Sequence, residues 1–146
     1  MYYVDQEQID RRLAFIPTLL QACRELQEES ETAEFGDGSL LFHLAQERTL
    51  VLAIETVTDI GSLLIDAFMM RDASSYEDIV EILSGEKVID AELASVLTAL
   101  VQMRRFLTQD YTEISRTGLH PLIGALPEAL GGFAAAVPAF ISKESL

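Results

Sequence analysis

An arginine lies inside an otherwise apolar heptad pattern in the second half of the chain. The pattern advances by four and then three residues, like the buried stripe of a helix, over Leu93, Leu97, Leu100, Arg104, Leu107, Tyr111 and Ile114. Burying an unpaired guanidinium is costly, so Arg104 must pair with an acid, extend its charged end to solvent or face a cleft. Two alternatives stay open: a structural arginine, in a salt bridge or at the rim of the helix, and an arginine that faces a cleft.

A line of polar residues in the segment 40–70 offers acids for that arginine. Its members fall at steps of seven, four, three and four, along one side of a helix: Arg48, Glu55, Asp59, Ser62 and Asp66. The rest of the segment is nearly all aliphatic, which indicates a largely buried helix. Such a line faces solvent by default, but in a buried helix it can line a shared cleft. We therefore expect Arg104 to interact with Glu55, ahead of Asp59.

Metal, phosphate-loop and serine chemistry find no support in the sequence. His43 and His120 lie far apart, and with Cys23 as the lone cysteine they give no zinc-ligand spacing. No Glu-x-x-His pair supports a di-iron bundle, and there is neither a glycine-rich phosphate loop nor a serine elbow. We expect no metal and no cofactor.

The elements that must position these residues are helices, since apolar residues recur every three to four positions and no alternating strand pattern occurs. The helices are expected over about 5–29 with a bend at Pro17, 40–70, 76–84 and 90–114. Glycines and prolines should break the segment 118–146 into helical pieces. The sequence predicts an all-α, up-and-down bundle of four or five helices.

Polar residues mark the ends of these helices. Asp5, Ser75 and Asp90 are N-cap candidates, and Ser75 with Asp78 resembles a capping box. The acidic stretch 25–37 is expected to be a solvated loop, although it could equally be a surface for a basic partner.

Length, composition and charge bound the class of protein. With 146 residues, 49% of them hydrophobic, the chain fits one domain with a substantial core and excludes a disordered protein. Its 24 acids and 10 bases give a net charge of −14, which excludes a protein that coats RNA or DNA. The longest uncharged stretch, 129–142, is shorter than the roughly 20 residues that span a bilayer. With no signal-peptide pattern at the start, we expect a cytoplasmic protein without a membrane span.

The segment 103–111 resembles the signature of the HepT-like family in the HEPN superfamily. That signature is an arginine, four residues, a histidine, one residue and a tyrosine, and here it reads Arg104, Gln109 and Tyr111. The motifs Ala53-Ile54-Glu55, Asp59-Ile60 and Ser75-Tyr76 follow the family's order and spacing. The resemblance covers about residues 5–114 and extends to the YutE-like branch of small bacterial proteins, in which glutamine also occupies the histidine position.

The resemblance implies a fold, an activity and a partner. HepT-like proteins are homodimeric helical bundles that act as toxins, cleave RNA without metal and pair with a MntA-type nucleotidyltransferase antitoxin. That antitoxin adds AMP to the motif tyrosine. By this resemblance, Arg104 would hold the scissile phosphate, and Tyr111 would position the substrate and accept AMP. Gln109 replaces the general acid–base, and because an amide exchanges no proton near neutral pH, catalysis is expected to be impaired.

Two hypotheses about function follow. The first is a HepT-like ribonuclease toxin with weak activity, or one that uses another base such as Asp110 or Glu55. The second is a non-catalytic, homodimeric protein- or nucleotide-binding module that partners a nucleotidyltransferase. Both predict a single domain over 1–146 with its core at about 5–114. Both also predict a symmetric homodimer, because the 40–70 helix is apolar on more sides than a small bundle covers.

Overall fold

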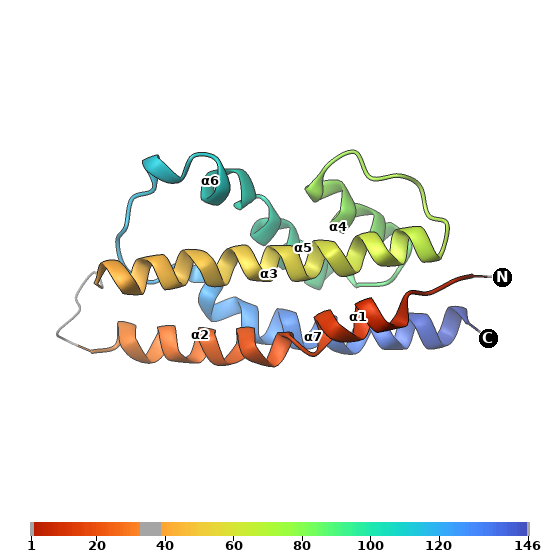
Figure 1. Cartoon of the computed structure of the whole chain (residues 1–146), viewed down its shortest axis with the longest axis horizontal. Coiled ribbons are helices and arrows are strands. Elements are labelled where there is room, and N and C mark those ends of the chain that lie inside the picture. The colour runs from red at the N-terminus through yellow and green to blue at the C-terminus, as the bar shows by residue number, and fades with distance from the viewer. Residues whose placement is uncertain (1, 33–38, 146) are drawn as a thin grey trace.

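The computed structural model describes residues 2–32 and 39–145 of the chain (Figure 1). Those residues contain helices and no strand. The elements are α1 (Gln6–Leu13), α2 (Ile16–Ser30), α3 (Leu40–Ala67), α4 (Tyr76–Gly85), α5 (Ala91–Val101), α6 (Arg104–Thr108), the 3₁₀-helix η1 (Tyr111–Glu113) and α7 (Pro121–Glu144). The all-α class expected from the sequence is confirmed.

The helices run up and down along one long axis (Figure 1). α1 and α2 run one way, α3 returns beside them, the segment from α4 to α6 leads back, and α7 returns to end near the N-terminus. α2 packs on α3 and α7, while α5 packs on α4 and α7. The predicted up-and-down bundle is confirmed.

α3 is the central helix of this bundle. It contacts α1, α2, α4, α5 and α6, and the side chains of Ile54, Val57 and Ile60 are fully buried. Burying an aliphatic side chain of this size contributes about 1.5–3 kcal/mol. Most of the apolar sides on which the homodimer prediction rested are therefore covered within one chain.

The predicted helix starts are confirmed. The side-chain oxygens of Asp5, Ser75 and Asp90 each accept the backbone N–H of the residue three positions on, which satisfies a donor that the first turn leaves unpaired. The Ser75 bond to the N–H of Asp78 is 3.0 Å long. The other half of the predicted capping box differs, since the Asp78 carboxylate accepts the N–H of Ser74 rather than that of Ser75.

Residues 5–29 form two helices rather than one bent helix. α1 ends at Leu13 and α2 begins at Ile16, so Pro17 lies in the first turn of α2, where its missing N–H would have no partner in the helix. α2 continues to Ser30, so the loop predicted over 25–37 is wrong at its start: Leu26 stays buried there and continues the apolar side of the helix. Residues 33–38 of that loop lie outside the described part.

The single helix predicted over 90–114 is wrong. α5 ends at Val101 and α6 begins at Arg104, because the N–H of Met103 bonds the carbonyl of Leu100 at 3.1 Å, one residue closer than in an α-helix. The two pieces have different neighbours, since α6 packs on α3 whereas α5 also packs on α4 and α7. Arg104 therefore starts a new helix, and Tyr111 lies beyond that helix in η1.

The prediction that 118–146 breaks into pieces is also wrong. α7 is continuous over 24 residues, with Pro127 and Pro138 inside it. Each of these prolines removes a backbone hydrogen bond from the helix, and the burial of one apolar stripe against α2 and α5 outweighs that loss. The fully buried residues of the stripe are Ile123, Leu126, Leu130, Phe133 and Val137. By length and composition alone α7 could also cross a membrane, a test that the core helix of a globular protein passes as well.

Candidate functional site

Arg104 lies at the start of α6 and turns toward α3. Its Nε donates to Oε1 of Glu55 at 3.4 Å, across 49 positions of sequence. The Arg104 side chain is 27% exposed and that of Glu55 is 39% exposed, so the pair lies at the rim of the bundle rather than in its core. The ion pair expected between these two residues is present, in its half-exposed form.

The aromatic ring of Tyr76 covers one face of the Arg104 guanidinium. Tyr76 is the first residue of α4, and the Arg104 Cζ lies 3.8 Å from the centre of its ring. At that distance the negative face of the ring attracts the cation. In the sequence, Tyr76 stood out only as part of the Ser75-Tyr76 motif of the family resemblance. No spacing rule could place its ring against α6.

These two contacts leave the outer edge of the guanidinium available. Glu55 takes the Nε donor and Tyr76 takes a face, while the two terminal nitrogens of Arg104 make no hydrogen bond with any residue that the structure describes. Two terminal N–H groups in one plane match the spacing of two phosphate or carboxylate oxygens. The arrangement can therefore bind an anion.

Asp59 does not contribute to this centre. Its carboxylate accepts the Nε of Arg12 from α1 at 3.1 Å, one α3 turn away from Glu55. The predicted polar line thus divides, with Glu55 linked to α6 and Asp59 linked to α1. Arg48, Ser62 and Asp66 are exposed, as the default interpretation of the line expects.

Gln109 and Tyr111, the other two residues of the motif, are exposed. Gln109 caps the C-terminal end of α6, and Tyr111, 56% exposed, begins η1. Neither side chain hydrogen-bonds to a residue within the described ranges, and neither is joined to Arg104. Asp110, one of the alternative bases, lies 3.8 Å from the Nε of Arg105.

A buried carboxylate fixes the loop that leads into α4 and Tyr76. Both oxygens of Asp78 accept from Arg71 at 2.7 Å, and one of them also accepts the N–H of Ser74 at 2.9 Å. The Arg71 guanidinium, together with Ser74, holds the pKa of Asp78 well below its usual range. The start of α4 is thereby fixed in a charged state at neutral pH.

The structure brings together two histidines that the sequence analysis treated as unrelated. His43 and His120 line the same cavity of about 200 Å³, between α3, α6 and the segment before α7. His120 Nδ1 accepts the N–H of Leu122 at 3.0 Å, and burial lowers the pKa of this histidine. His43 Nε2 is buried and unpaired among the residues described. No group of three metal-ligating side chains converges in the described part of the chain.

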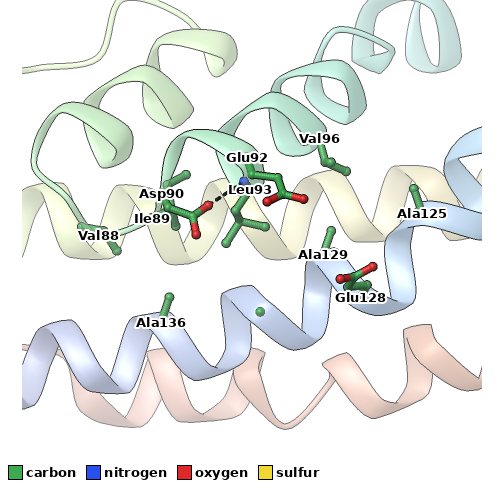
Figure 2. A pocket seen from close by; sticks show the side chains of 11 residues that line it. Val88, Ile89, Asp90, Glu92, Leu93, Val96, Ala125, Glu128, Ala129 and Ala136 are labelled. Atoms are coloured by element: carbon green, nitrogen blue, oxygen red, sulfur yellow. Dashed lines mark hydrogen bonds between the residues drawn. The ribbon is translucent and has the colours of Figure 1, made fainter.

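A larger groove lies between α5 and α7 (Figure 2). Its volume is about 450 Å³ and its walls are mostly aliphatic, with Val88, Leu93 and Ala129 among them. The only charged residues in its lining are Asp90, Glu92 and Glu128. Three carboxylates without a base repel a phosphate backbone, so this groove is no candidate for RNA binding.

Comparisons with known proteins agree with the fold and with the resemblance. The family model described as ribonuclease HepT-like matches residues 18–125. "Putative RNase YutE" of Bacillus subtilis (strain 168) is 34% identical over 144 residues, which cover 99% of this chain and 94% of that protein. The solved structure of YutE from Bacillus subtilis, described as a cytosolic protein of unknown function, matches with a TM-score of 0.84 at 33% identity, over 99% of this chain and 95% of that one.

A second solved structure shares the fold alone. It is a toxin–antitoxin crystal structure with AMP-PNP, which matches with a TM-score of 0.76 at 15% identity, over 91% of this chain and 98% of that one. The arrangement of helices around Arg104 is thus found in proteins with little sequence in common.

Proposed function

Because this chain belongs to the HepT-like ribonuclease family, we propose that it is the toxin-type member of a toxin–antitoxin pair, with Arg104 as its phosphate-binding residue. The observation that carries the proposal is the open edge of the Arg104 guanidinium, flanked by Glu55 and Tyr76. A charge-assisted, bidentate contact from such an edge to a phosphodiester is roughly twice as strong as a neutral hydrogen bond and also fixes the orientation of the phosphate. The proposal places the whole chain, 1–146, in a single domain.

Catalysis is proposed to be impaired and independent of metal. Gln109 supplies no proton near neutral pH, and general acid–base help is worth about 10²- to 10⁴-fold in rate. The two alternative bases are poorly placed to replace it, since Glu55 already accepts from Arg104 and Asp110 lies beside Arg105. Arg104, Gln109 and Tyr111 together form the proposed, weakened active site.

A homodimer and a MntA-type nucleotidyltransferase are the proposed partners. Leu41 and Leu44 are exposed on α3, as is Phe106 on α6, which supports a contact surface on the side of the bundle that carries Arg104. Tyr111 is 56% exposed, which supports access by a transferase that would attach AMP. We place this activity in the cytoplasm.

Cleavage of a mixed single-stranded RNA tests the proposal. Wild type should cleave weakly, Arg104→Ala should abolish that cleavage, and Arg105→Ala should not change it. Arg105 is the matched control because it has the same charge, neighbours Arg104 and is 80% exposed. Equal cleavage by wild type and Arg104→Ala would refute the proposed role of Arg104.

A gain-of-function variant tests the role of Gln109. Gln109→His restores a group that titrates near pH 6.5, so cleavage should rise by about tenfold or more and should vary with pH near that value. The double variant Gln109→His with Arg104→Ala should return to background. No gain in a folded Gln109→His protein would contradict the view that the glutamine alone limits catalysis.

The second candidate function is a non-catalytic binding module for a nucleotidyltransferase. The net charge of −14 and Gln109 favour it, since both oppose RNA cleavage. It predicts that Gln109→His leaves the protein inactive on RNA while a purified nucleotidyltransferase still binds.

A further inference from the structure

We infer that Tyr76 is a positioning residue for the phosphate-binding centre: its ring, with Glu55, holds the Arg104 guanidinium so that the two terminal nitrogens stay open to an anion. This inference rests on the proposed function for the identity of the anion, an RNA phosphate. The contact between the ring and the guanidinium is independent of it.

The two contacts act in different directions. Glu55 holds one edge of the guanidinium through a single hydrogen bond of 3.4 Å, and a long side chain with one such anchor can still swing about it. Tyr76 packs against the flat face, 3.8 Å from the Arg104 Cζ, which restricts that swing. Only the two contacts together define the plane and the direction of the terminal nitrogens.

The position of Tyr76 is itself fixed by the chain around it. Ser75 caps α4 directly before Tyr76, and Asp78, in the first turn of the helix, binds Arg71 and Ser74. α4 also packs on α3, the helix that carries Glu55. The ring and the carboxylate that hold Arg104 therefore belong to one packed unit.

The ring, and not the hydroxyl, is the active part of Tyr76. The Tyr76 hydroxyl makes no hydrogen bond with a residue of the described ranges, and the residue is 41% exposed. Phenylalanine should therefore replace tyrosine without loss. Leucine, which is apolar but has no aromatic face, should not.

Two measurements on the full-length protein test the inference. The first is the NMR shift of the Arg104 side-chain protons, which the ring current of Tyr76 moves and which is assigned from an Arg104→Lys sample. The shift should persist in Tyr76→Phe and disappear in Tyr76→Leu. The second is the affinity for a short single-stranded RNA at low salt, with Tyr3→Leu as the control for loss of an exposed aromatic ring.

The expected result is that Tyr76→Leu weakens RNA binding about 2- to 10-fold, as removal of one cation–π contact should. Tyr76→Phe and Tyr3→Leu should bind like wild type, and adding Tyr76→Leu to Arg104→Ala should cause no further loss. If Arg104→Ala weakens binding but Tyr76→Leu does not, the positioning role is overturned and the proposed function stands. If Arg104→Ala itself has no effect, both are overturned, and the NMR shift then reports only a structural contact.

Discussion

Gly61 fixes how closely α3 and α4 approach, and its replacement by alanine is the sharpest stability test that the structure offers. A Cβ atom added at Gly61 would lie 2.4 Å from Cγ2 of Ile79 and 3.3 Å from Cδ1 of Leu83, both on α4. The first distance is more than 1 Å shorter than an ordinary carbon–carbon contact of about 3.5–4.0 Å. The Cγ2 methyl group of Ile79 can move away only if χ1 leaves the rotamer that isoleucine strongly prefers in a helix, so either this side chain is strained or α4 shifts.

The magnitude follows from two opposing effects. Overpacking of a filled contact costs about 1–3 kcal/mol of the free energy of unfolding. Replacing glycine by alanine inside a helix returns about 0.5–1 kcal/mol. Gly131→Ala isolates the second effect, because an added Cβ there has no atom within 4 Å and Gly131 lies inside α7. Gly61→Ala should therefore be less stable than Gly131→Ala by about 1–3 kcal/mol.

Thermal unfolding followed by circular dichroism measures this difference. At about 2–4 °C per kcal/mol for a chain of this size, the melting temperature of Gly61→Ala should lie about 2–12 °C below that of Gly131→Ala. Adding Ile79→Leu, which removes the Cγ2 methyl group, should recover part of the loss. If Gly61→Ala is as stable as Gly131→Ala, the close approach of α3 and α4 is refuted.

Two further predictions concern charged and titrating groups. Glu55→Ala should lower the free energy of unfolding by less than about 1 kcal/mol, since the pair with Arg104 is half exposed; a loss of about 3–5 kcal/mol in thermal unfolding would show a buried pair instead. Burial lowers the pKa of His120 in the folded chain, so below about pH 6.5 the unfolded chain binds more protons at this residue than the folded chain does. The free energy of unfolding should therefore fall as the pH drops below about 6.5. His120→Asn, which keeps an acceptor for the N–H of Leu122 but does not titrate, should flatten that slope in denaturant unfolding at pH 7 and pH 5.

Local signals predicted much of the fold correctly. Ser75 and Asp90 mark the starts of α4 and α5, because a cap depends only on the residue and the three that follow it. The break before Arg104 left no such signal. Neither glycine nor proline occurs there, and the heptad pattern runs straight through it, so only contacts with other helices could reveal the break. Pro127 predicted a break that does not occur, because the packing of α7 outweighs the tendency of proline to end a helix.

The candidate site likewise contains one contact that the sequence could predict and others that it could not. An arginine in an apolar stripe and an acid on a buried helix need each other, so the pair of Arg104 and Glu55 could be predicted without a structure. Tyr76 could not, since its ring reaches Arg104 only through the placement of a whole helix. The shared cavity of His43 and His120 was missed for the same reason, because 77 positions of sequence separate them.

The charge of the chain and the geometry of Arg104 act on RNA in opposite directions. The field of a net charge of −14 repels phosphate out to about one Debye length, 8–10 Å at physiological salt, whereas Arg104 binds at hydrogen-bond distance and shares its charge with Glu55. A second copy of the chain brings the same negative charge, so a homodimer alone would increase the repulsion. A basic partner would lower this repulsion, and the same negative charge that slows the approach of RNA would speed the association of that partner. Dependence of cleavage on Arg104, and not RNA affinity alone, is therefore the measurement that separates a weakened toxin from a binding module.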